Sequence, residues 1–350
     1  MSQVFLLGFK DIGRLPELLL KSGLREVIRP DNFTAIKLHF GEQGNIGYIR
    51  PAWVRPVVEL VKKQQAIPFL TDASTIYKGK RSDAVNHSLV AAEHGFTIET
   101  CGAPVIIADG LRGNSFQQVT VKGKHFTSVK IAQDIFYADS LVCLSHFKGH
   151  ELSGFGGALK NLGMGCGAKA GKYEMHNSVL PVIDPGKCTA CRLCFKWCPT
   201  QAISLLNKKA VIDPNKCIGC GDCILSCSFH AVQITWNETY TAVQEKIAEY
   251  AAGVLANKKD KCLYVNFLNH ITAYCDCYPS QPKDKPLIND IGLVASLDPV
   301  SIDQASADLV NQAAGRDLFK EIWPPINWAD QLNHAEILGL GERKYSLEII

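Results

Sequence analysis

Short runs of apolar residues alternate along most of the chain with longer stretches in which apolar positions recur every three to four residues. The short runs predict buried strands, and the longer stretches predict helices with one apolar face. The predicted strands are Val4 to Leu7, Thr34 to Leu38, Pro68 to Thr71, Val105 to Ala108, Leu141 to Ser145, Cys262 to Phe267 and Gly292 to Ala295. The predicted helices are Arg14 to Lys21, Pro51 to Lys63, Asp83 to His94, Tyr240 to Ala256 and Ile302 to Ala313. This alternation is typical of an α/β fold in which helices flank a mostly parallel sheet.

A segment that repeats itself interrupts this pattern between Pro181 and Tyr240. Ile183-Asp184-Pro185-Gly186-Lys187-Cys188 recurs 29 residues later as Ile212-Asp213-Pro214-Asn215-Lys216-Cys217, and each copy continues as C-x2-C-x2-C-x3-C. We therefore predict an α/β domain made of residues 1–180 and 238–350, with a small α+β domain inserted at residues 181–237. Such an insertion is expected at the carboxyl edge of the sheet, where open α/β folds bind ligands.

The repeat supplies eight cysteines in two groups of four. The first group is Cys188, Cys191, Cys194 and Cys198, and the second is Cys217, Cys220, Cys223 and Cys227. Thiolates are soft ligands, and such tight runs let a chain wrap an iron-sulfur cubane. Structural zinc is the alternative, but zinc sites usually take separated pairs of cysteines. The spacing therefore predicts two 4Fe-4S clusters.

On these motifs the segment resembles a bacterial two-cluster ferredoxin, including Pro199 directly after Cys198. In that family the fourth cysteine of each run binds the other cluster. The resemblance therefore implies one cluster on Cys188, Cys191, Cys194 and Cys227, and a second on Cys217, Cys220, Cys223 and Cys198. Ser228 stands where the second copy should repeat the proline, which removes no ligand.

The composition of the chain indicates the cellular environment of the protein. Its 350 residues are 47% hydrophobic, enough for about two domains, and they include 14 cysteines. The first residues lack the basic and apolar regions of a signal peptide, and no apolar run reaches the roughly 18 residues of a membrane helix. We therefore expect a cytoplasmic protein of a reducing, anaerobic setting, without a membrane span. The lysines are spread along the chain, which argues against a nucleic-acid partner.

A glycine- and lysine-rich stretch follows the strand predicted at Leu141 to Ser145. Glycines let backbone amides approach an anion, and lysines supply positive charge. We predict an anion site from Lys148, Gly156, Gly157 and Asn161, although the glycines alone also suit a flexible loop. If the chain is an enzyme, His146, Lys160 and Asp298 are the candidates for proton transfer.

Three cysteines outside the repeat suggest a third metal site. Cys275 and Cys277 alternate along the chain, so an extended backbone points both thiols to one face. They could bind a metal together with Cys166, and with His146 or His176 as a further ligand. The alternative is simple packing, because a buried free cysteine behaves as a small apolar residue.

Two further positions remain ambiguous from the sequence. Asp298 precedes Pro299 and a predicted helix, and an N-terminal cap is its more common role at such a place. Lys37 and His39 end an early strand and could either face a cleft or stand in solvent.

Several landmarks together resemble the domain of unknown function 362 family. They are the end of the strand at His146, the run Lys160-Asn161-Leu162-Gly163-Met164-Gly165-Cys166, Gly171-Lys172 with His176, Cys275-Asp276-Cys277, and Ala295-Ser296-Leu297-Asp298-Pro299-Val300-Ser301-Ile302-Asp303. The resemblance implies an α/β domain distantly similar to the nickel-pincer lactate racemase family, often with a ferredoxin insertion. It implies no substrate.

These observations favour an iron-sulfur electron-transfer protein that relays electrons through two 4Fe-4S clusters to a site in the α/β domain. A redox partner protein is then expected. One alternative is an iron-sulfur oxidoreductase that acts on a small anionic substrate. A second alternative is a partner that delivers electrons during the activation or assembly of another enzyme. The chain has no G-x-G-x-x-G after its first strand, which disfavours a Rossmann-type flavin or nicotinamide site.

Overall fold

The computed structural model describes residues 1–177, 179–234, 237–281 and 285–350. Its centre is an eight-stranded sheet in the order β16-β1-β15-β14-β7-β2-β3-β4. The bounds in that order are Tyr345–Ile349, Ser2–Gly8, Gly292–Ser296, Cys262–Leu268, Ser140–His146, Phe33–Lys37, Ile67–Asp72 and Val105–Ile107. The pairings make β15 the one strand of this sheet that runs antiparallel to the others. The predicted α/β fold with a mostly parallel sheet is confirmed.

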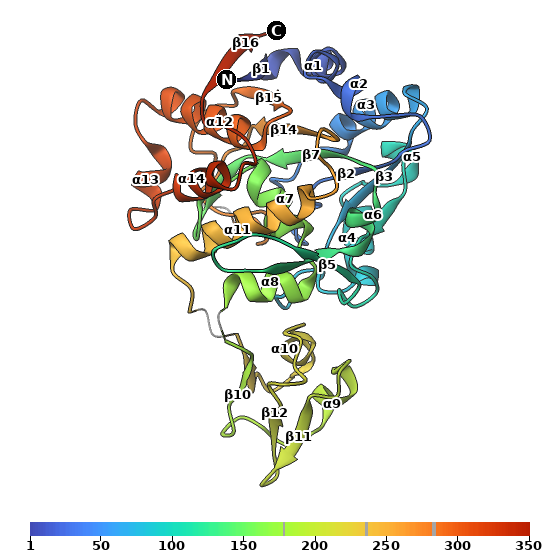
Figure 1. Cartoon of the computed structure of the whole chain (residues 1–350), viewed down its shortest axis with the longest axis vertical. Coiled ribbons are helices and arrows are strands. Elements are labelled where there is room, and N and C mark those ends of the chain that lie inside the picture. The colour runs from blue at the N-terminus through green and yellow to red at the C-terminus, as the bar shows by residue number, and fades with distance from the viewer. Residues whose placement is uncertain (178, 235–236, 282–284) are drawn as a thin grey trace.

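The central strands are buried on both faces, which explains their continuous apolar sequences. All seven residues of β7 are buried, and their side chains alternate between two cores. Leu141 and Cys143 pack into one core, while Val142 and Leu144 pack into the other. The sheet is therefore covered by helices on both sides (Figure 1).

Different helices complete the two cores. On one face lie α7 (Ala158–Cys166), α11 (Tyr240–Leu255), α12 (Pro299–Ala314) and α14 (Asp330–Ile337). On the other face lie α1 (Leu15–Lys21), α2 (Leu24–Val27) and α3 (Pro51–Lys63). The remaining helices of this domain are η1 (Phe9–Arg14), α4 (Ala84–Glu93), α5 (Ile98–Cys101), α6 (Gln133–Tyr137), α8 (Lys169–His176) and α13 (Leu318–Ile322). The domain also contains two short hairpins, β5 (Phe116–Thr120) with β6 (Ser128–Ala132), and β8 (Lys148–His150) with β9 (Gly154–Gly156).

The cysteine repeat forms a small unit of its own beneath α8 (Figure 1). Its outer strands β10 (Val182–Ile183) and β13 (Val232–Gln233) pair with each other, and β11 (Ile203–Leu206) pairs with β12 (Lys209–Ile212). One short helix lies in each copy of the repeat, α9 (Leu193–Trp197) and α10 (Asp222–Ser226). Residues 235 and 236, within the predicted insertion 181–237, lie outside the described residues.

In the part of the chain that the structure describes, no helix is both long enough and apolar enough to cross a membrane.

Candidate functional site

A pocket opens where the strand order reverses, at the carboxyl ends of β2 and β7. Its empty volume, which includes space open to solvent, is about 710 Å³. The residues that line it come from β2, β3, β7, β8, β9, α7, α8 and the loops after β2, β3 and β14. Such a switch point is where open α/β sheets bind ligands, because neighbouring loops diverge there.

Lys37 closes the floor of the pocket and is held by two partners. Its ammonium lies 2.7 Å from Oδ1 of Asn161 and 2.9 Å from Oδ1 of Asp72. Burial alone lowers the pKa of Lys37, but the Asp72 carboxylate and nearby thiols outweigh it and raise the pKa. Lys37 is therefore a charged, paired residue inside the pocket, and the possibility of a solvated strand end is ruled out.

Among the described residues that line the pocket, Asp72 at the end of β3 is the only carboxylate. It lies 3.6 Å from Nη1 of Arg81 and 3.6 Å from Nε2 of His87, in addition to its contact with Lys37. Burial by itself raises the pKa of Asp72, yet these neighbours, Lys37 first, hold it well below its usual range. Asp72 is thus a fixed negative charge that fastens two cations to the pocket wall.

His146 and Asp276 form a second buried pair at the end of β7. Nδ1 of His146 lies 2.8 Å from Oδ2 of Asp276, and Nε2 lies 2.8 Å from the carbonyl oxygen of Asn269. Both ring nitrogens of His146 are therefore engaged by oxygen atoms. Lys148 adds a third contact, 2.9 Å from the same Asp276 oxygen. His146, a predicted proton-transfer residue, is therefore engaged in holding the Cys275-Asp276-Cys277 loop.

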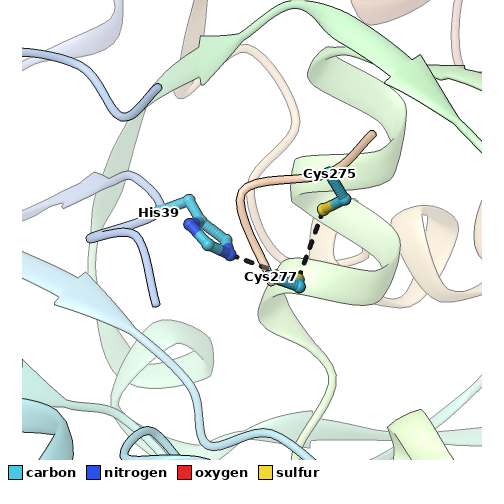
Figure 2. A group of neighbouring side chains, drawn as sticks. All are labelled: His39, Cys275 and Cys277. Atoms are coloured by element: carbon cyan, nitrogen blue, oxygen red, sulfur yellow. Dashed lines mark hydrogen bonds between the residues drawn. The ribbon is translucent and has the colours of Figure 1, made fainter. Parts of the chain in front are cut away.

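The two thiols of this loop line the pocket, and they lie beside the ring of His39 (Figure 2). Their sulfur atoms are 3.3 Å apart, and Nε2 of His39 lies 3.4 Å from the Cys277 sulfur. The ligand atoms of His39, Cys275 and Cys277 all lie within 4.8 Å of one another, a spacing compatible with metal binding. The predicted common face of Cys275 and Cys277 is what the structure shows, but the third member of the group is His39.

Cys166 does not join this group. It is the last residue of α7, it is fully buried, and its thiol lies 3.5 Å from the carbonyl oxygen of Asn161. It is absent from the described residues that line the pocket. The expected combination of Cys166 with Cys275 and Cys277 is corrected accordingly, because α7 places its last residue under the pocket floor rather than in its wall.

The environment gives the two thiols opposite acidities. The hydrogen bond donated by Cys275, supported by the Arg81 guanidinium and opposed by burial, lowers the pKa of Cys277 to about 5. The same hydrogen bond and burial raise the pKa of Cys275 to about 12. Lys160 stands 3.8 Å from the Cys275 sulfur. These surroundings favour the thiolate form of Cys277 over that of Cys275.

The predicted anion site is mostly occupied by the chain itself. The amides of Ala158 and Leu159, which begin α7, donate to the Asp303 carboxylate at 2.7 and 2.9 Å. A Cβ atom on Gly157 would lie 2.2 Å from that carboxylate, so glycine is required for this close approach. The glycine run therefore serves the packing of α7 against α12, and its helix amides do not face the pocket as expected.

The other predicted anion ligands are also committed, Lys148 to Asp276 and Asn161 to Lys37. Cationic side chains still outnumber carboxylates in the lining of the pocket. The lining includes five cationic side chains, Lys37, Arg81, Lys148, Lys160 and Lys172, against the single carboxylate of Asp72. Lys172 donates to the carbonyl oxygen of Gly167 at 2.8 Å, and burial lowers its pKa to about 8. The pocket thus suits an anionic ligand, with Lys160 and Lys172 as its less strongly paired cations.

Asp298 lies elsewhere and has a structural role. Its carboxylate caps α12 by accepting from the amides of Val300 and Ser301 at 2.8 and 2.9 Å. Its other oxygen accepts from the Ser2 hydroxyl and the Glu342 amide. Asp298 follows the antiparallel strand β15, which ends at the opposite edge of the sheet from the pocket. This corrects the expectation of a catalytic Asp298, and the capping alternative is what the structure shows.

The eight cysteines of the repeat line two separate cavities in the small unit. The first cavity, of about 360 Å³, is lined by Cys188, Cys191, Cys194 and Cys227. The second, of about 320 Å³, is lined by Cys198, Cys217, Cys220 and Cys223. Each cavity thus combines three cysteines of one copy with the fourth cysteine of the other copy.

Backbone amides point at several of these sulfur atoms. The amides of Ala202, Ala210 and Ala231 donate to the sulfur atoms of Cys198, Cys188 and Cys227 at 3.2, 3.4 and 3.2 Å. Amide donors of this kind stabilise negatively charged sulfur. Cys191 is exposed, whereas the other seven cysteines are buried or half-buried.

The small unit contacts the walls of the pocket. Nζ of Lys78 lies 2.7 Å from the carbonyl oxygen of Cys227, and Ile76 packs into the apolar cluster around the cysteines. Tyr77, between them, lines the pocket. This loop follows β3, so the small unit lies at the carboxyl edge of the sheet, where the insertion was predicted.

Arg81 and Asp276 were not identified from the sequence as pocket residues. Arg81 lies in a loop after β3 without any motif, and its contacts with Asp72 and Glu42 place it in the pocket wall. Asp276 lies inside a motif that drew attention to its two cysteines. Cys101, Cys143 and Cys262 are buried in apolar surroundings and outside the pocket lining.

Two solved structures are similar to the chain at low sequence identity. The structure is similar to the lactate racemase apoprotein from Thermoanaerobacterium thermosaccharolyticum, with 12% identity, a TM-score of 0.44, 89% of this chain covered and 58% of that one. It is also similar to a protein from Thermotoga maritima, with 8% identity, a TM-score of 0.43, and 87% and 59% covered. The chain therefore spans less than two thirds of either protein.

No curated protein sequence matches the chain. The family model described as "Domain of unknown function (DUF362)" matches residues 34–308. That match includes the ends of β2, β3, β7 and β14, the Cys275-Asp276-Cys277 loop and the whole cysteine repeat. The chain belongs to the DUF362 family.

Proposed function

We propose that the protein is an iron-sulfur electron-transfer protein that delivers electrons to the pocket of its α/β domain. The observation that carries this proposal is the arrangement of the eight repeat cysteines in two cavities of four, a donor set that suits two 4Fe-4S clusters. When bound, such clusters supply one-electron transfer at a potential set by hydrogen bonds and exposure.

The composition of each cavity favours the crossed assignment. Cys188, Cys191, Cys194 and Cys227 would hold one cluster, and Cys198, Cys217, Cys220 and Cys223 the other. The amides that donate to Cys188, Cys198 and Cys227 fit thiolate ligands of a cluster. A zinc site would also accept four thiolates, but two copies of this compact spacing are the pattern of a ferredoxin.

The contacts of the small unit suggest how electrons enter and leave. Exposed Cys191 marks the side that a redox partner protein can approach. Gly219, in the second cysteine run, lies against Tyr173 of α8. The same helix contributes Lys172 and His176 to the pocket. Electrons would therefore leave through α8 and the Ile76–Lys78 loop toward the pocket.

A second candidate, an oxidoreductase acting on a small anionic substrate, rests on the charge of the pocket. Five cationic side chains against one carboxylate among the described lining residues favour a bound anion. Lys160 and Lys172 would bind it. Lys172, with a pKa of about 8, can also give up a proton near neutral pH. In this role His146 orients the Cys275-Asp276-Cys277 loop and transfers no proton.

A reductive titration of the anaerobically purified protein tests the electron-transfer proposal. We expect the visible absorbance to bleach as each cluster takes up about one electron, at the low potentials typical of ferredoxin-like centres. The Cys191→Ala variant should lose the part of this uptake assigned to the first cavity, and Cys101→Ala serves as its control. A chain that takes up no electrons, or that holds only zinc, would overturn the proposal.

A further inference from the structure

Cys275 and Cys277 are held as a close pair at the pocket wall. The Cys275 thiol donates to the Cys277 sulfur across 3.3 Å. The amide of Tyr278 donates to the carbonyl oxygen of Cys275 at 3.3 Å, which closes a turn around the pair. Asp276, between them, is fixed on the other side by His146 and Lys148. The two sulfur atoms therefore cannot easily turn away from each other.

The surroundings of the pair favour negatively charged sulfur. The Arg81 guanidinium favours a negative charge on Cys277, and Nε2 of His39 lies 3.4 Å from the same sulfur. Lys160 approaches Cys275 on the other side. An anionic thiolate is both the nucleophile that forms a disulfide and the product that remains when a disulfide is reduced.

A metal ion bound by His39, Cys275 and Cys277 is the alternative, and two observations argue against it. The amide of Gly41 donates to Nδ1 of His39 at 3.0 Å, so the neutral ring carries its proton on Nε2, the nitrogen that faces Cys277. That nitrogen then has no lone pair for a metal. In addition, Arg81 and Lys160 place positive charge beside both sulfur atoms, which disfavours a further cation.

We propose that Cys275 and Cys277 are a redox-active dithiol that forms an intramolecular disulfide and accepts two electrons at the pocket wall. In reduction the S–S bond breaks, each sulfur receives one electron, Cys275 takes up a proton as a thiol, and Cys277 remains a thiolate. A second proton is needed only when Cys277 is protonated. The electrons come from a low-potential one-electron donor, and this step rests on the proposed function because the two clusters are donors of that class.

The observed distance makes this exchange feasible. A disulfide requires about 2.05 Å between the sulfur atoms, so the pair must close by a little over 1 Å from 3.3 Å. Two cysteines separated by one residue form a small, strained ring, and strain makes a disulfide easier to reduce. Two electrons that arrive one at a time would thus together reduce one disulfide beside an anion-binding pocket.

The test is thiol mapping at controlled potential on the cluster-containing protein. The protein is equilibrated anaerobically at stepped potentials with small redox mediators, quenched in acid, alkylated and analysed by mass spectrometry. We expect the peptide with Cys275 and Cys277 to carry two alkyl groups at low potential and none at high potential. At high potential it should be lighter by two hydrogens than the dithiol, and the transition should follow a two-electron curve.

Variants make the assignment specific. Cys275→Ser and Cys277→Ser should each abolish the transition, whereas Cys101→Ala, in a distant core, should preserve it. Two thiols that remain open to alkylation at every potential would overturn the inference. So would zinc or nickel bound at one ion per chain and lost in Cys277→Ser.

Failure of the inference and failure of the proposed function give different results. Dithiothreitol can reduce a disulfide without any cluster. A pair that responds to dithiothreitol in a chain without iron would support the dithiol and overturn the electron relay. An iron-loaded chain whose Cys275 and Cys277 never form a disulfide would overturn the dithiol alone.

Discussion

Nζ of Lys169 lies 3.1 Å from Oδ1 of Asp222, and the side chains of both residues are only 1% exposed. Lys169 begins α8, which contributes to the pocket, and Asp222 begins α10, between two repeat cysteines. Asn114 donates to the second oxygen of Asp222 at 2.8 Å. This buried ion pair fastens the cysteine unit to the α/β domain.

Breaking this ion pair on one side should loosen the cysteine unit. Asp222→Leu leaves the Lys169 ammonium buried without its carboxylate, and such a loss typically costs about 3–5 kcal/mol. We expect faster hydrogen exchange at residues 179–234 and in α8, measured by mass spectrometry, and slower electron transfer. Lys187→Ala removes an exposed pair with Asp184, 3.7 Å apart, and should change exchange little. Equal effects of the two variants would contradict the docking role of Lys169 and Asp222.

The two cavities predict which cluster each fourth cysteine serves. Cys198→Ala should damage the cluster held by Cys217, Cys220 and Cys223, because Cys198 lines their cavity. Cys227→Ala should damage the other one. Iron analysis and low-temperature EPR of the reduced variants measure this, since the remaining cluster keeps its own signal. Loss from the cavity of Cys188 after Cys198→Ala would contradict the crossed assignment.

Lys172 should make stability depend on pH. Its pKa of about 8 is below the value of 10.5 in an unfolded chain, so between these values the unfolded chain binds a proton that the folded chain does not. The free energy of unfolding therefore rises as pH increases from about 8 to 10.5, by about 3 kcal/mol for this group.

The Lys172→Met variant should lose this pH-dependent part of the free energy of unfolding. It should also be more stable than the parent protein near pH 7. Lys258, with a pKa also near 8, adds a slope of the same sign, whereas buried cysteines with a raised pKa, such as Cys166, add a slope of the opposite sign, so the contribution of Lys172 is the difference between the variant and the parent protein. Denaturant unfolding at a series of pH values measures the effect, with exposed Lys10→Met as control. An unchanged slope in Lys172→Met would rule out the buried ammonium as its source.

Asp276 should be essential for the position of the two thiols. Asp276→Asn replaces the carboxylate that His146 and Lys148 share, and we expect a loss of about 3 kcal/mol or more. Hydrogen exchange of residues 269–281 should increase, and Cys275 and Cys277 should become easier to alkylate. Asp290→Asn, at an exposed position that accepts from the His270 amide, is the matched control. Unchanged exchange in Asp276→Asn would show that another contact holds the loop.

The strands and the cysteine repeat were predictable because their signals are local. All seven predicted strands and all five predicted helices occur near the predicted positions, since buried parallel strands and amphipathic helices leave periodic patterns. The antiparallel direction of β15 left no such pattern. The helix cap at Asp298 was identified as an alternative because its residue type and position are typical of caps.

The pocket was less predictable because its contacts join distant parts of the chain. Arg81 and His39 lie near Cys277 because the loop that follows β14 packs against the ends of β2 and β3. His39, and not the expected Cys166, is therefore the neighbour of the two thiols. The glycine run was interpreted as an anion site, yet the buried carboxylate of Asp303, far along the chain, occupies the helix amides. Sequence spacing alone carries no information on such partners.

Metal and sulfide analysis of the anaerobically purified protein, together with low-temperature EPR after reduction, decides whether the eight repeat cysteines hold iron-sulfur clusters. We expect about eight irons and eight sulfides per chain, with magnetically coupled signals from two reduced 4Fe-4S clusters. Zinc in place of iron, or iron without acid-labile sulfide, would contradict this expectation.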